Sequence, residues 1–150
     1  MKTSKTIVEL KLRGLSAVLC YPVSQKEADR FRQALEDPGS GLFPLRTAHG
    51  MGAIVSLDDL LYVRTGELEG SVLVGVPDGI RVHLRGETGG VEFSMDEDSR
   101  DEISVLVDYL EDTQDVEAFI EWKEHGRRLV AVNLAQVMLF EYPLKWEKGG

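Results

Sequence analysis

Alternation of apolar and polar residues dominates the chain and predicts a protein built mainly from antiparallel strands. The clearest examples are the stretches Val8-Glu-Leu-Lys-Leu12 and Ile80-Arg-Val-His-Leu84. Alternation places the apolar side chains on one face of a strand and leaves the other face for solvent, which is typical of antiparallel sheets. Two further segments, 25–36 and 97–112, carry apolar residues at the 3.6-residue spacing of a helix. The pattern therefore predicts an α+β fold.

The first of these helices has clear start and stop signals. Ser24 is followed three residues later by Glu27, and a serine and a glutamate at this spacing form a capping box that satisfies backbone N–H groups at a helix start. Pro38 and Gly39 follow the last apolar residue, Leu35, and neither residue type favours continuation of a helix. We expect the helix to end before them.

A repeated order of short motifs predicts that the second half of the chain is a copy of the first. In chain order the matches are Leu12-Arg-Gly14 with Leu84-Arg-Gly86, Phe43 and His49-Gly50 with Phe119 and His125-Gly126, and Val55-Ser-Leu57 with Val132-Asn-Leu134. They predict an internal duplication of a β-β-α-β-β unit with one helix per unit, the first unit spanning 1–69 and the second 70–150. Because a polar residue before glycine is common in hairpin turns, two unrelated halves with similar turns are the alternative.

The strands expected in the two units follow from the alternating stretches between these turns. In the first unit they are 6–13, 16–23, 42–48, 52–57 and 60–64, and in the second unit 71–75, 80–85, 89–94, 118–123, 128–134 and 136–142. We expect two similar sheets, each with one helix, packed together as one body. Open edges of two small sheets would permit a homodimer.

Composition narrows the class of protein without naming a function. The 150 residues carry a net charge of -9 and one cysteine, Cys20, so an internal disulfide is excluded and a reducing compartment is favoured. No apolar run approaches the ~20 residues that span a bilayer, and the alternating N-terminal stretch is unlike a signal peptide. We therefore expect a cytoplasmic protein that does not enter a membrane.

The negative charge lies in the second unit, which makes its helix the candidate binding surface. Residues 1–75 carry nine basic and nine acidic side chains, whereas residues 76–150 carry eight and seventeen. Within 96–115 nine acids accompany a single basic residue, Arg100. The predicted partner-binding residues are Asp98, Asp101, Glu102, Asp108 and Glu111. The alternatives are a solvated helix whose early acids favour the helix dipole, and a calcium site, although the run lacks the glycine and ligand spacing of the calcium-binding loop.

No motif in the chain indicates catalysis, so we expect a protein that is not an enzyme and needs no cofactor or metal. A nucleophile elbow, a phosphate-binding loop, a paired-cysteine motif and a zinc-protease motif are all missing from the sequence. Cys20 lies in an apolar stretch and is expected to be a buried structural thiol. His83 is expected to lie outward beside Arg81 and Arg85, and His49 and His125 are expected in matching turns.

The sequence favours a non-catalytic protein that binds a protein partner, one with a basic surface, through the acidic helix face of the second unit. Two other functions remain open: binding of a small molecule between the two units, where ligand sites often form, and mimicry of nucleic acid by the acidic surface. Direct binding of nucleic acid is disfavoured, because such binding depends on Lys and Arg contacts to phosphate and these residues are outnumbered. Trp146 is expected to fold back on its own sheet or to contact another subunit.

Overall fold

A computed structural model describes residues 6–36, 41–67, 70–87, 89–112 and 119–147. In these residues the chain forms two α-helices, α1 Gln25–Glu36 and α2 Asp101–Asp112. The strands are β1 Thr6–Leu12, β2 Leu19–Val23, β3 Leu42–Arg46, β4 Met51–Ser56, β5 Leu60–Gly66, β6 Ile80–Leu84, β7 Gly90–Phe93, β8 Phe119–Lys123, β9 Leu129–Asn133 and β10 Val137–Pro143. Short 3-10 turns at Leu57–Asp59, Glu97–Ser99, Leu134–Gln136 and Leu144–Trp146 connect or end several of them.

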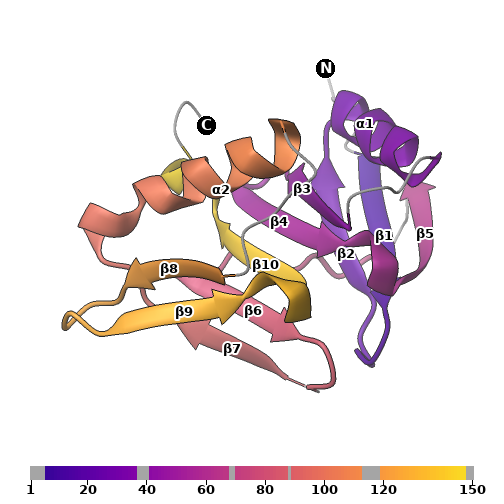
Figure 1. Cartoon of the computed structure of the whole chain (residues 1–150). Helices are drawn as coiled ribbons and strands as arrows, with labels where there is room; N and C mark the ends of the chain where they lie inside the picture. The colour runs from indigo at the N-terminus through magenta and orange to yellow at the C-terminus, as the bar shows by residue number, and fades with distance from the viewer. Residues whose placement is uncertain (1–5, 37–40, 68–69, 88, 113–118, 148–150) are drawn as a thin grey trace.

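The strands form three antiparallel sheets, which confirms the α+β class (Figure 1). One sheet has the order β2-β1-β5, a second has the order β3-β4-β10-β6-β7, and β8 and β9 form a hairpin of their own. The expectation of two similar sheets, one in each half, is wrong. The reason is that β4 of the first half pairs with β10 of the second half, so that one sheet of five strands contains elements of both.

The two halves of the chain have the same order of elements. Residues 6–66 run strand, strand, helix, strand, strand, 3-10 turn, strand, and residues 80–143 run the same way, with one more 3-10 turn before α2. Within each half the first strand pairs with the second and with the last, as β1 does with β2 and β5 and as β6 does with β7 and β10. Each last strand also carries an irregularity at its second residue, Leu61 in β5 and Met138 in β10.

The strand expected over 16–23 begins only at Leu19, and two other expected elements also differ from the structure. Residues 71–75 form no strand, although the backbone N–H of Val74 donates to the carbonyl of Cys20 over 3.0 Å, so the segment lies along the edge of β2. The second helix starts at Asp101 and not at residue 97, because Glu97–Ser99 form a separate 3-10 turn whose N-cap is the side chain of Asp96. The first helix spans 25–36 as predicted, and Ser24 caps it through the backbone N–H of Glu27.

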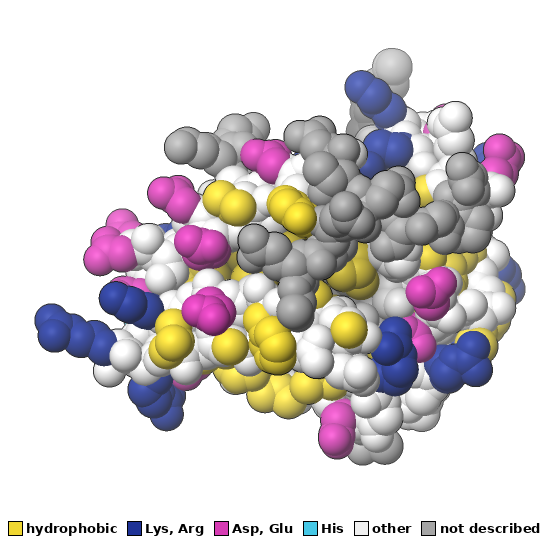
Figure 2. Space-filling view, in the orientation of Figure 1, with side chains coloured by type: hydrophobic (Ala, Val, Ile, Leu, Met, Phe, Trp, Pro, Cys, Tyr) yellow, Lys and Arg dark blue, Asp and Glu magenta, His cyan; other side chains and the backbone are white. Residues whose placement is uncertain are grey.

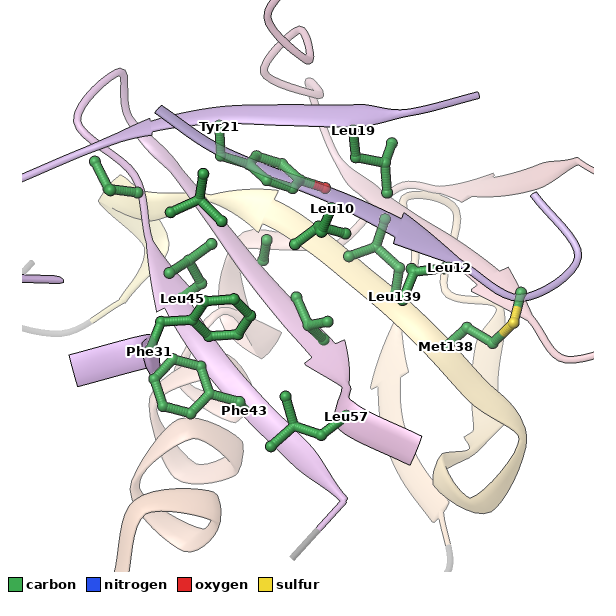
Figure 3. Packing of buried hydrophobic residues seen from close by; sticks show 14 of the residues in the cluster. Leu10, Leu12, Leu19, Tyr21, Phe31, Phe43, Leu45, Leu57, Met138 and Leu139 are labelled. Carbon is green, nitrogen blue, oxygen red and sulfur yellow. The ribbon is translucent and has the colours of Figure 1, made fainter. Parts of the chain in front are cut away.

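The hydrophobic core lies on both faces of the five-stranded sheet. Alternate residues of the central strand β10 point to opposite faces: Leu139 packs in a cluster with residues of the first half, and Phe140 packs in a second cluster with Trp122 and residues of α2. Figure 3 shows Leu139 among side chains of the first cluster, where Phe31 of α1 also lies against Phe43 of β3. The second half thus completes the core of the first.

The pairing of β4 with β10 depends on a glycine. Gly52 lies opposite Tyr142 in the register of the two strands. A Cβ atom at Gly52 would come within 2.1 Å of Cζ in the Tyr142 ring, so the ring occupies the space that any other residue at position 52 would need. The Tyr142 hydroxyl donates a hydrogen bond to Glu147 over 2.9 Å, which fixes the ring over the glycine.

Among the described residues, none of the helices is both long and apolar enough to cross a bilayer.

We predict that Gly52→Ala destabilises the protein by about 2 kcal/mol or more, because an added methyl group in a filled core forces neighbouring atoms to move. Urea unfolding followed by circular dichroism measures the change. The matched control is Gly75→Ala, since a Cβ there meets no atom within 4 Å, and this change should alter stability by less than about 0.5 kcal/mol. Equal effects of the two substitutions would contradict the role of Gly52.

Candidate functional site

The outward face of α2 carries most of the predicted partner-binding residues. Asp101, Glu102 and Asp108 are exposed on the helix, and Asp98 is exposed in the 3-10 turn before it. These four residues are called the acidic face below. Figure 2 shows acidic side chains gathered over α2, above an apolar area on the β8–β9 hairpin. In the middle of the face Val105 is 59% exposed.

The helical spacing of the apolar residues explains why these carboxylates point outward. Ile103, Leu106, Val107 and Leu110 are buried in the second core cluster, and one apolar stripe of this kind leaves the opposite side of a helix to solvent. Asp101 and Glu102 lie in the first turn, where a negative charge interacts favourably with the helix dipole. Part of the acidic pattern therefore stabilises the helix itself.

The acidic face makes no ion pair within the described part of the chain, whereas Glu111 makes one. A carboxylate oxygen of Glu111 lies 2.6 Å from Nη2 of Arg46, which also lies 2.5 Å from Oε1 of Glu147. Desolvation lowers the pKa of Arg46, but its hydrogen bonds to Glu147 and Glu111 outweigh this and raise the pKa overall. Glu111 thus links α2 to β3, and the structure separates it from the other four predicted residues.

A groove of about 550 Å³ runs beside the acidic face, between α2 and the β8–β9 hairpin. Its lining includes Glu102 and Val105 of α2, Phe119 of β8 and Leu129 of β9. Phe119 is 48% exposed and Leu129 is 66% exposed, so two large apolar side chains in the lining of this groove face solvent. Apolar surface and unpaired carboxylates therefore adjoin on this side of the molecule.

Two further polar clusters lie where the halves meet, and the first surrounds Asp59. Its carboxylate is buried, accepts hydrogen bonds from Arg85 over 2.6 and 3.1 Å and from the Ser56 hydroxyl over 2.8 Å, and lies 3.9 Å from Nε of Arg13. Hydrogen bonds from Arg85 are the largest cause of a lowered pKa for Asp59. The arginines of both Leu-Arg-Gly turns thus contact one carboxylate, a role that the motif itself did not reveal.

The second polar cluster surrounds Glu141, a buried residue of β10. The Tyr21 hydroxyl donates to it over 2.8 Å and Nε of Arg81 over 2.6 Å. Burial, followed by the charge of Glu141, raises the pKa of Tyr21. His83 lies on the same face of β6 as Arg81, as expected, but this face does not point outward: the His83 side chain is only 16% exposed, and its Nε2 lies 3.9 Å from a carboxylate oxygen of Glu141. Burial is the main cause of a lowered pKa for His83.

The remaining histidines and the cysteine lie in different environments. His49 bonds through Nε2 to the carbonyl of Val74 and through Nδ1 to the Thr47 hydroxyl, both over 2.8 Å, whereas His125 is exposed. Cys20 is buried as predicted, and burial raises the pKa of its thiol. In the part of the chain that the structure describes, no three His, Cys, Asp or Glu side chains gather as metal ligands.

A cavity of about 370 Å³ lies within the second half, where no sequence pattern predicted one. Its lining includes Arg100, Trp146, His125, Asp78 and Glu92. Trp146 folds back into the core, and the Arg100 guanidinium lies 4.7 Å from the centre of its ring. Nε of Arg100 and Nε1 of Trp146 are buried and donate no hydrogen bond within the described residues.

Comparison of the chain with models of protein families, with curated proteins and with solved structures found no significant match.

We predict that Asp59→Asn destabilises the protein by about 2 kcal/mol at pH 7, because hydrogen bonds to a buried charge contribute roughly this much. The lowered pKa of Asp59 means that its contribution is present above the unfolded pKa of about 3.9 and is lost as the pH falls through the folded pKa. The difference between wild type and variant should therefore shrink in acid.

Urea unfolding at pH 7 and at pH 3 tests this prediction. The neighbouring residue Asp58 is exposed, so Asp58→Asn is the matched control and should change stability by less than about 0.5 kcal/mol. A loss for Asp59→Asn that stays constant from pH 7 to pH 3 would show that the charge of Asp59 is not what stabilises the junction.

Proposed function

We propose that this chain is a non-catalytic protein that binds a partner protein through the acidic face of α2. The observation that carries the proposal is a set of four exposed carboxylates that make no ion pair in the described residues and surround the exposed Val105. Charged groups around an apolar centre are the usual anatomy of a protein interface. The sign of the charge favours a partner surface rich in Lys and Arg, since complementary potentials speed association and exclude wrong partners.

We also infer that the two halves are copies of one β-β-α-β-β unit with a further last strand. The shared order of elements and the shared pairing of first with last strands support this. With the helices aligned from their first residues, Lys26 and Arg32 of α1 correspond to Glu102 and Asp108 of α2. A reversal of charge on otherwise similar helices supports a task for the acidic face beyond solvation.

We predict that the triple variant Asp98→Asn, Glu102→Gln, Asp108→Asn binds the partner about tenfold more weakly, which corresponds to roughly 0.5 kcal/mol for each of three exposed ion pairs. A pull-down from lysate with the wild-type protein identifies the partner by mass spectrometry, and titration of the two purified proteins then gives Kd for each variant. The loss should come mainly from a slower association rate and should diminish as salt is added.

The matched control removes the same number of negative charges from exposed positions of the first half, with Asp29→Asn, Glu36→Gln and Asp58→Asn. This control should keep the wild-type Kd and melting temperature. Equal binding by both triple variants would overturn the proposal. If nucleic acid competes with the partner for the acidic face, the surface acts as a nucleic-acid mimic, which is the narrower form of the same function.

A second candidate function is supported by the cavity beside Arg100 and Trp146. Nε of Arg100 and Nε1 of Trp146, buried donors without an acceptor among the described residues, favour an anionic group, and the acidic residues Asp78 and Glu92 in the lining favour an amine on the same molecule. This combination fits a small zwitterion such as an amino acid. The cavity lies within the second half and not between the units, where the sequence analysis expected a small-molecule site.

We predict that a fitting zwitterion raises the melting temperature, since binding at a hundredfold excess over Kd stabilises a protein by about 2.7 kcal/mol. The probes are glycine, glutamate and inorganic phosphate in a thermal-shift assay. Arg100→Gln should abolish the rise, whereas Arg32→Gln on the exposed face of α1 should preserve it. No rise with any of these probes would remove this candidate.

A further inference from the structure

We propose that this protein assembles with copies of itself, with β9 of one copy pairing along β5 of the next. The proposal rests on the inferred equivalence of the two halves and is independent of the acidic face. Its starting point is the contact that already exists inside the chain. There, the fourth strand of the first half pairs with the last strand of the second half, β4 with β10.

With the two halves exchanged, the equivalent contact does not form among the described residues. It would join the fourth strand of the second half, β9, to the last strand of the first half, β5. Yet β9 pairs only with β8, and β5 pairs only with β1. Both therefore present an unpaired edge within the described residues, and an unpaired edge is a template for a strand from another chain.

The register inside the chain predicts the register between copies. The pairing within the two hairpins and the irregularities at Leu61 and Met138 in the two last strands give the same offset of 77 residues. The pairs Val55 with Leu139 and Gly52 with Tyr142 then become Val132 with Tyr62 and Leu129 with Thr65. In the contact inside the chain Gly52 accommodates Tyr142, and in the predicted contact between copies Leu129 faces Thr65. Each pair combines a large side chain with a small one.

Four exposed apolar residues lie on β5 and on the β8–β9 hairpin, which this contact would bring together. Leu61 is 53% exposed and Tyr62 is 43% exposed, whereas their equivalents in β10, Met138 and Leu139, are buried against the first half. On the other side, Phe119 and Leu129 are exposed, whereas the equivalent of Phe119, Leu42 of β3, packs against the core of the second half.

The predicted contact joins two different surfaces, so it is head-to-tail. Contacts of this type generate a closed ring of two or more copies, or a filament if the rotation does not close. The acidic face stays accessible in such an assembly, because the equivalent residues of α1, such as Lys26 and Arg32, remain exposed beside the β4–β10 contact. One assembly would therefore display several acidic faces at once.

The first experiment measures the mass of the purified full-length protein by size-exclusion chromatography with light scattering. The expected result is a mass at a multiple of 16.7 kDa that is two or larger. A wild-type protein that remains monomeric over the whole accessible concentration range would overturn the proposal.

The second experiment separates the two surfaces. Variant one carries Leu61→Lys and Tyr62→Lys on β5, and variant two carries Phe119→Lys and Leu129→Lys on the β8–β9 hairpin. Each variant alone should be a monomer, because every contact needs both β5 and β9, and each variant has lost one of these two surfaces. Mixed together, they should form a one-to-one dimer, because variant one keeps a functional β9 and variant two keeps a functional β5. A contact between two identical surfaces cannot give this result.

Failure of the mixture to form that dimer, or assembly of either variant alone, would contradict a head-to-tail contact. The single substitutions Leu61→Lys and Leu129→Lys replace the doubles if circular dichroism shows that a double variant is unfolded. Asp108→Lys is the control: this residue is exposed on the acidic face and lies outside the lining of the groove that contains Phe119 and Leu129, so the change should weaken partner binding and leave the mass of the assembly unchanged. The control also distinguishes failure of this proposal from failure of the proposed function.

Discussion

The antiparallel pairing of β4 with β10 is the interaction on which the rest of the structure depends. It places the last strand of the chain at the centre of the five-stranded sheet, and every residue of that strand is buried. Its side chains contribute to both core clusters, one on each face of the sheet. Without the pairing, each half would have to stabilise itself with a core from little more than half of the chain, and burial falls steeply with size in small domains.

The buried polar residues follow from the same pairing. Glu141 of β10 is buried against the first half. A buried carboxylate is tolerated only when it is paired and hydrogen-bonded. Tyr21 from one half and Arg81 from the other satisfy it. Asp59 plays the corresponding part at the end of the sheet, between the arginines of the two matching turns. The junction is therefore specified by charge as well as by shape.

Local pattern predicted the elements well, and it predicted the orientation of the acidic face. Helical spacing alone was enough to place Asp101, Glu102 and Asp108 outward. It could not place Glu111, whose partner Arg46 lies 65 positions earlier in the chain and approaches only through the sheet. Residues 71–75 were expected as a strand because they are apolar, yet Val72 and Leu73 are exposed, and the segment meets β2 through the backbone N–H of Val74 without forming a strand.

The sequence could not predict which strands pair, because alternation of apolar and polar residues indicates a strand but not its neighbour in the sheet. The match of Phe43 with Phe119 illustrates the difficulty. Pairing within the two hairpins instead makes Ile120 the equivalent of Phe43. A shift of one residue turns a side chain to the other face of a strand, and accordingly Phe43 is buried whereas Phe119 is exposed. Identical residues in similar sequence motifs of the two halves therefore need not occupy equivalent positions in the fold.

The opposite polarity of two cross-strand ion pairs has a consequence for how the chain folds. Glu9 of β1 faces Arg64 of β5, whereas Arg81 of β6 faces Glu141 of β10. If the similar last strands exchanged places during folding, Glu9 would face Glu141 and Arg81 would face Arg64. Like charges directly opposite each other destabilise a sheet, so the arrangement penalises the swapped topology and directs each terminal strand back to its own half.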